Sequence, residues 1–242
     1  MIIPYLARDL RSLKACSLTC RSLSIAAAPH LHHTLTLTEN RPEFNRSRLE
    51  PLSRLHKLDI MSLVREIRVK QGGGTNSWFV PGAFSSLNLR YFYAFARVHT
   101  LKIQNMRVYR FLPAVKRYFP PTIRSIALYD PCCTPRQLSY FLSRFPNLDN
   151  VDIERIVACV PDTTVPVTEL APPSAPTLRG RLSLSEFPLV DTWTRFTTLC
   201  GGLRFRHMDL VKSANCVPTL LEACAETLES IRFHVEDGTL SE

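Results

Sequence analysis

The sequence predicts an α/β solenoid made of strand–helix repeats of about 25 residues, preceded by a small helical segment. Three observations predict this fold: an apolar spacing that recurs along the chain, helical stretches between the recurrences, and a compact helical pattern near the start. The composition is that of a folded chain, because 45% of its 242 residues are hydrophobic and 21% are charged. A chain of this length can bury a sizeable core.

The first element is an amphipathic helical pattern within residues 1–34. A helix that begins at Asp9 gathers its apolar residues near one arc, and Ser17 is a candidate start for a second helix. The gathered residues are Leu10, Leu13, Cys16, Cys20 and Leu23. Such an arc must pack on something, either the open first repeat of a solenoid or another protein.

The spacing apolar-x-x-apolar-x-apolar then recurs along residues 35–242. Six copies begin at Val64, Val98, Ile123, Leu148, Phe205 and Leu228. Leu182 and Leu184 keep the last two positions of a further copy, whereas Arg179 stands at its first position. The copies at 98, 123 and 148 begin 25 residues apart, within the 20–29 residues of leucine-rich repeats. The last two positions point to one side of a short strand.

Helical patterns separate the predicted strands, at residues 108–119, 134–145, 191–199 and 217–228. The pattern at 134–145 has Thr134 as its N-cap and Pro135 at its first position. Residues 71–82 and 159–180 are predicted loops, because glycines or prolines cluster there. Strand, turn and helix in repetition predict a curved solenoid over residues 35–242.

In such a solenoid, the residues between the core positions project onto the concave surface. The candidate binding residues there are Arg68, Lys70, Lys102, Gln104, Tyr129, Asp152, Glu154, Asp209, Arg232 and His234. This lane starts basic, passes an aromatic residue and turns acidic, which suits a protein partner of complementary charge. The alternative is an ordinary solvated surface.

The charge is concentrated in one region of the chain. The formal net charge is +9, and residues 41–117 hold 15 Lys or Arg residues but four acidic ones. This basic region fits an acidic protein partner, nucleic acid or a solvated basic face. Aromatic residues do not alternate with the basic ones as a base-stacking platform requires, so nucleic acid is the less favoured partner.

The sequence contains no motif of an enzyme or cofactor site. A nucleophile elbow, a P-loop, a zinc-protease motif and a dinucleotide fingerprint are all missing. Cys16 and Cys20 followed by His30, His32 and His33 match no familiar zinc spacing. We therefore expect a protein that is not an enzyme and that holds no cofactor and no metal.

The cysteines and the apolar stretches bear on location. Eight cysteines, two of them adjacent at Cys132 and Cys133, follow no disulfide framework, which predicts reduced thiols. No stretch reaches the roughly 18 apolar residues of a membrane span. The opening MIIPYLARDL reverses the order of a secretory signal. We expect a protein of the cytoplasm or nucleus that does not enter a membrane.

The opening residues resemble the F-box family. The matching features are IIPYL at residues 2–6, Asp9-Leu10, Leu13, Cys20-Arg21 and Leu23. The resemblance covers about 35 residues, and F-boxes followed by degenerate leucine-rich repeats are a common fungal arrangement. The family's Leu-Pro-x-Glu opening and full first helix are missing, so we expect a truncated F-box-like segment.

This resemblance implies a non-enzymatic substrate-recognition subunit of an SCF-type (cullin-RING) ubiquitin ligase. A Skp-family adaptor would contact Leu6, Leu10, Leu13, Cys16, Cys20 and Leu23, and the solenoid would bind a protein substrate. The alternatives are a ligase-independent leucine-rich-repeat scaffold and, less favoured, a nucleic-acid-binding solenoid that uses residues 41–117.

Overall fold

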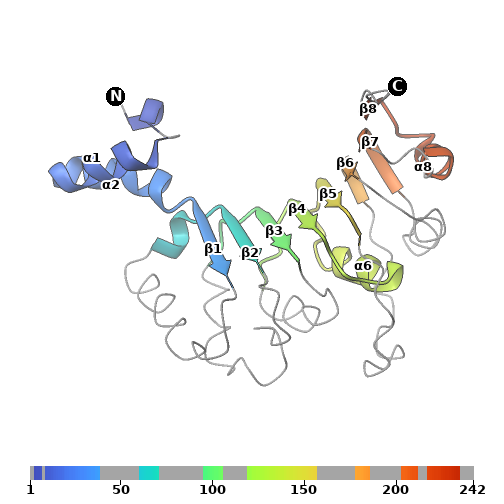
Figure 1. The fold of residues 1–242 in the computed structure, drawn as a ribbon, viewed down its shortest axis with the longest axis horizontal. Coiled ribbons are helices and arrows are strands. Elements are labelled where there is room, and N and C mark those ends of the chain that lie inside the picture. The colour runs from blue at the N-terminus through green and yellow to red at the C-terminus, as the bar shows by residue number, and fades with distance from the viewer. Residues whose placement is uncertain are drawn as a thin grey trace, which may run out of the picture.

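The computed structural model describes residues 3–6, 9–38, 60–70, 95–105, 119–156, 178–185, 203–211 and 217–234. Its strands are β1 (Thr34–Thr38), β2 (Glu66–Lys70), β3 (Thr100–Gln104), β4 (Ser125–Tyr129), β5 (Asn150–Glu154), β6 (Leu178–Ser185), β7 (Leu203–Val211) and β8 (Ser230–His234). These strands form one open parallel sheet in chain order, as Figure 1 shows. The predicted α/β class is therefore confirmed.

The helices of the described part lie in two places. Figure 1 places η1 (Ile3–Leu6), α1 (Leu10–Thr19) and α2 (Arg21–Leu31) beyond β1, whereas α6 (Pro135–Leu142) and α8 (Val217–Cys224) lie along the outer side of the bent row of strands. A short turn, η3 (Ile60–Leu63), precedes β2. No helix in these ranges is long and apolar enough to cross a bilayer.

The recurring apolar positions form the core of the sheet. Parallel register places Ile67 beside Leu101, Leu101 beside Ile126 and Ile126 beside Val151. The third position follows the same rule, since Val69 lies beside Ile103. The first positions are buried as well, from Val64 and Val98 through Ile123 and Leu148 to Phe205. Each fully buried side chain of this size contributes about 1.5–3 kcal/mol of transfer free energy.

The strands also begin in a repeated way. The carbonyl of His33 accepts hydrogen bonds from the N–H groups of Arg65 and Glu66, at 2.9 and 3.1 Å. The carbonyl of Arg65 binds the next strand in the same manner, and so do those of His99 and Arg124. The residue before each of these strands is therefore held at one level along the edge of the sheet.

The strands β3, β4 and β5 end in a left-handed residue. Asn105, Asp130 and Arg155 have φ angles of 55°, 51° and 49°. Their N–H groups donate to the last carbonyl of the following strand, for example from Asp130 to Glu154 at 2.9 Å. The sheet therefore gains one more hydrogen bond at each of these strand ends before the chain turns away.

The helix at 134–145 begins as predicted and ends earlier. Thr134 caps α6 by accepting the N–H of Gln137 at 3.2 Å, and Pro135 takes the first turn. The helix ends at Leu142, but Phe145 still packs edge-on against Phe141, with ring centroids 5.4 Å apart. The predicted helix at 217–228 likewise ends at Cys224.

Some predicted elements lie outside the described residues. They are the loop at 71–82, the helix at 191–199 and, apart from Phe119, the helix at 108–119.

The predicted loop at 159–180 is wrong for its last three residues, because β6 begins at Leu178. Leu178 is buried and takes the apolar role that the pattern left to Arg179. The pairing of β6 with β7 shifts between Gly180 and Arg181, where Arg206 of β7 has no partner on β6 and Gly180 has a φ of +85°. A glycine in this conformation is typical of a β-bulge.

The prediction of reduced thiols is wrong for Cys132, which is disulfide-bonded. Cys16, Cys20, Cys133 and Cys224 are free thiols. Burial raises the pKa of Cys133 to about 12, so this thiol is not a reactive nucleophile near neutral pH.

The bulge at Gly180 generates a stability prediction. A Cβ atom at this position would lie 1.9 Å from the backbone oxygen of Asp149. We expect Gly180→Ala to lower the free energy of unfolding by at least about 2 kcal/mol in urea denaturation. Arg179→Ala, at an exposed neighbour on the same strand, is the control and should change stability by less than about 0.5 kcal/mol. Similar values for the two variants would contradict this role of the bulge.

Candidate functional site

The side of the sheet opposite the core, here called the polar face, carries all ten residues predicted for the binding lane. One row contains Arg68, Lys102, Asp152, Asp209 and Arg232, and the row one step toward the strand ends contains Lys70, Gln104, Tyr129, Glu154 and His234. Parallel register aligns these rows because it also aligns the apolar residues between them. The structure thus brings the ten residues onto one surface.

The sequence analysis missed a third row on this face. Its members are Thr34, Glu66, Thr100, Ser125, Asn150, Arg181, His207 and Ser230. Each stands directly before the second apolar position of its copy, and strand alternation turns that residue onto the polar face. The strands begin one residue earlier than the apolar pair suggests, and this alternation is the signal that could have found the row.

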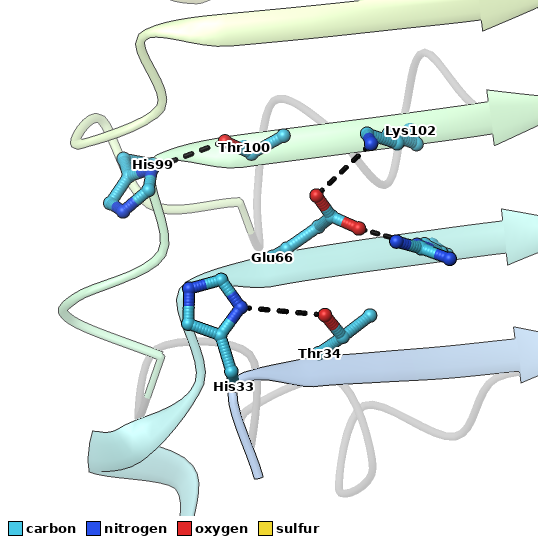
Figure 2. A network of polar contacts seen from close by, with 7 residues as sticks. His33, Thr34, Glu66, His99, Thr100 and Lys102 are labelled. Carbon is cyan, nitrogen blue, oxygen red and sulfur yellow. Dashed lines mark hydrogen bonds and ion pairs between the residues drawn. The ribbon is translucent and has the colours of Figure 1, made fainter. Parts of the chain in front are cut away.

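Glu66 ties β2 to β3 on the polar face. It is 9% exposed, forms an ion pair with Arg68, and accepts from the Nζ atom of Lys102 at 3.2 Å, as Figure 2 shows for Lys102. Burial alone would raise the pKa of Glu66, but the two cations outweigh it and hold the pKa below its usual range. The carboxylate therefore stays ionised and neutralises part of a basic surface.

A second ion pair joins β6 to β7. Arg181 donates from Nε to Oδ2 of Asp209 at 2.6 Å, and Asp209 is 8% exposed. The pair links the row that the sequence analysis missed to the predicted lane. Because its carboxylate is buried and its guanidinium is half-exposed, it fixes this part of the face rather than offering a free charge.

The centre of the polar face is acidic and aromatic. Tyr129 lies beside Glu154 across β4 and β5. Burial raises the pKa of Tyr129, and the charges of Asp152 and Glu154 raise it further. Burial also raises the pKa of Asp152, against the hydrogen bond from Ser183. A half-buried phenol between carboxylates is a rigid anchor for a partner's side chain.

The polar face is unevenly charged. β2 and β3 carry three cations, Arg68, Lys70 and Lys102, and the carboxylate of Glu66 pairs with Arg68 and Lys102. Lys70 is exposed and has no ion pair among the described residues. Two strands further on, β5 presents Asp152 and Glu154. The surface therefore changes from basic to acidic across the sheet.

The six predicted adaptor-contacting residues divide into two groups. Leu13 is fully buried and forms a small core with Ile3 and Ala27, against which Leu6 and Cys16 pack. Leu13 is therefore a structural residue in this fold, out of reach of a partner. Leu10, Cys20 and Leu23 lie on the surface.

The helical unit formed by η1, α1 and α2 also exposes apolar residues that the sequence analysis did not name. Tyr5 is 89% exposed, Leu18 87% and Ile25 65%. The chain changes direction at Cys20, whose extended backbone separates α1 from α2. Leu18 lies on α1 before this break and Ile25 lies on α2 after it, so both helices contribute exposed apolar side chains.

Metal-binding chemistry has no support in the described ranges, where no three His, Cys, Asp or Glu residues gather into a cation site. No protein-family model matches the chain, and no curated protein is similar to it in sequence. The site is therefore interpreted from its own residues.

The Glu66 cluster generates a pH prediction. Glu66→Gln removes the charged partner of Arg68 and Lys102, and we expect it to cost about 1 kcal/mol of stability near neutral pH. Because the pKa of Glu66 is lower in the folded state, its ionised carboxylate stabilises the fold at pH values above the usual glutamate pKa. This stabilisation is lost as the pH falls through the folded-state pKa, so the cost of Glu66→Gln should shrink toward about pH 3. Urea unfolding at a series of pH values measures it. A cost that does not change with pH would contradict the ionised carboxylate.

Asp152→Asn should act in the opposite direction. Because the pKa of Asp152 is raised in the folded state, ionisation of this carboxyl destabilises the fold. The destabilisation develops as the pH rises through the usual pKa range of aspartate. We expect the variant to gain roughly 0.5 kcal/mol near neutral pH and to lose this gain in acid. The same urea series measures it, and a destabilised Asp152→Asn at neutral pH would contradict the assignment.

Proposed function

We propose that this protein is a non-enzymatic substrate-recognition subunit of an SCF-type ubiquitin ligase. Its N-terminal helical unit docks on a Skp-family adaptor, and its repeats form a leucine-rich-repeat-like solenoid that binds a protein substrate on the polar face. Its contribution is proximity, because a held substrate presents its lysines to the conjugating enzyme at high effective concentration.

The observation that carries the proposal is the alignment of charged and aromatic side chains over consecutive strands. Register places Lys102, Tyr129 and Glu154 on one open surface that changes from basic to acidic. Complementary charge orients a protein partner, and binding energy concentrates on a few aromatic and arginine anchors. This surface supports protein binding better than catalysis, since its carboxylates are paired or spread along the sheet.

The helical unit supports the adaptor part of the proposal. Within about thirty residues it exposes Tyr5, Leu10, Leu18 and Ile25, each by more than half of its surface. Exposed apolar side chains concentrated on one small unit favour a protein contact. The contact surface that we propose is therefore these exposed residues together with Leu23, rather than the buried Leu13.

A ligase-independent scaffold is the second candidate. It is favoured by the packing of Leu6, Leu13 and Cys16 into the unit's own core, which removes half of the predicted adaptor contacts. In that function the helical unit covers the first repeat and the polar face alone binds a partner. Most of the basic region 41–117, on which a nucleic-acid function would depend, lies outside the described residues.

Adaptor binding is the direct test. We expect the full chain to bind a purified fungal Skp-family adaptor with micromolar or tighter affinity in isothermal titration calorimetry. Leu10→Asp combined with Leu18→Asp should weaken binding at least about tenfold, equivalent to about 1.4 kcal/mol, because both residues are exposed on α1.

Leu221→Asp is the matched control, since Leu221 is an exposed leucine on α8. It should bind like the wild-type chain, and circular dichroism should show all variants folded. Equal binding by the double variant would exclude α1 as the contact. Failure of the wild-type chain to bind would replace the ligase function with the scaffold.

A further inference from the structure

The residue before each of the first four strands is basic. These residues, here called the basic edge, are His33, Arg65, His99 and Arg124. Their carbonyls hold them at one level, because each binds the N–H groups that open the next strand. Parallel strands lie about 4.8 Å apart, so the basic edge is a row roughly 14 Å long.

The two histidines are oriented by their neighbours. Nδ1 of His99 lies 3.1 Å from the hydroxyl of Thr100, and Nδ1 of His33 lies 3.4 Å from that of Thr34 (Figure 2). The donor in each contact depends on the tautomer of the ring, and Nε2 is the ring nitrogen outside these contacts. Both rings are exposed, and a protonated ring can donate from Nε2 to an anionic ligand.

The two arginines differ in how they are held. Arg65 donates from Nη1 to the carbonyls of Ser62 and Val64, at 2.7 and 3.2 Å, which fixes its guanidinium at the edge. Arg124 is 68% exposed and has a distant ion pair with Asp149, at 3.9 Å. A fixed guanidinium before β2 and an exposed one before β4 together suit a ligand with several anionic groups.

Positive charge outweighs negative charge at the basic edge among the residues that the structure describes. Burial lowers the pKa of His99, and His33, Arg65 and Arg124 lower it further, against a smaller opposite effect of Glu66. Glu66 is already paired with Arg68 and Lys102, and the half-exposed carboxylate of Asp149 lies 3.9 Å from Arg124. An anionic ligand would relieve the repulsion that remains among the basic groups.

We propose that the basic edge binds an acidic segment of a polypeptide partner. Side chains on one side of an extended segment repeat every 6–7 Å or so, so about three carboxylates match the length of the row. The edge continues into Arg68, Lys70 and Lys102 of the polar face, which gives a longer acidic segment further contacts. The inference rests on the proposed function, because it specifies the chemistry of the partner bound at this face.

A polypeptide fits this surface better than nucleic acid. Tyr129 is the one Phe, Trp or Tyr residue on the described polar face of β1–β4. Single-stranded nucleic acid needs several stacking platforms as well as positive charge. The donors of the basic edge also form a row, because each stands directly before the first residue of a strand. This row matches an extended chain with regularly spaced carboxylates.

Binding should depend on pH. An anion near His99 favours its protonated form, so the complex takes up a proton and tightens as the pH falls. The charged groups that face His99 are His33, Arg65, Arg124 and Glu66. Aspartate carboxylates remain ionised well below the range in which histidine titrates, so an aspartate peptide separates the two titrations.

The test uses the full chain and a fluorescein-labelled deca-aspartate peptide in an anisotropy titration. We expect affinity to rise at least about threefold between about pH 7.5 and pH 5.5. Arg124→Gln should weaken binding about fivefold or more at both pH values, and His99→Asn should abolish most of the pH dependence. Arg204→Gln, at an exposed arginine of β7 that belongs to neither the basic edge nor the polar face rows, is the matched control and should bind like the wild-type chain.

Three results would overturn the proposal. They are no binding of the peptide, equal weakening by Arg124→Gln and Arg204→Gln, and tighter binding of a single-stranded decanucleotide that is lost in Arg124→Gln. The last result would make the edge a nucleic-acid surface. Adaptor binding depends on α1 and not on this edge, so failure of either experiment is distinguishable from failure of the other.

Discussion

The parallel register of the eight strands is the constraint on which the rest of the structure depends. Because Ile67, Leu101 and Ile126 lie side by side, their apolar side chains form one continuous core. The same register necessarily aligns the residues between them, which places Lys102 next to Arg68 on the other side. A binding surface with ordered charge is therefore a direct geometric consequence of burying the repeated apolar positions.

Much of the fold could be predicted because the buried positions of each repeat can be identified from that repeat's own residues. The triad beginning at Val98 defines a strand and its buried side without reference to any distant residue, and Thr134 with Pro135 defines the start of α6 in the same way. Prediction of a strand fails where the spacing of its apolar positions differs by one residue from that of the other repeats. The pairing with β7 shifts beside the left-handed Gly180, and the buried residue before Leu182 is Leu178 instead of residue 179, so pattern matching did not find the start of β6.

The candidate site was predictable only in part, for two physical reasons. Apolar periodicity identifies the residues between core positions, but it does not mark where a strand begins, so Glu66 and Arg181 were missed although both form ion pairs on the polar face. Helical periodicity likewise does not reveal the break at Cys20. Leu13 and Leu18 lie five residues apart on α1 and face opposite ways, whereas the exposed Ile25 lies on the separate helix α2 that begins after the break.

The two apolar clusters differ in a way that bears on how the parts act. The sheet has a large core that runs from Met61 to Cys224, whereas the helical unit has three buried residues. Burying one large apolar side chain is worth about 1.5–3 kcal/mol, a small sum against the entropy of ordering some thirty residues. The helical unit therefore gains much from any partner that covers Tyr5, Leu18 and Ile25, and the sheet gains little. Under the proposed function, a partner that docks on the helical unit would therefore also stabilise the fold of that unit.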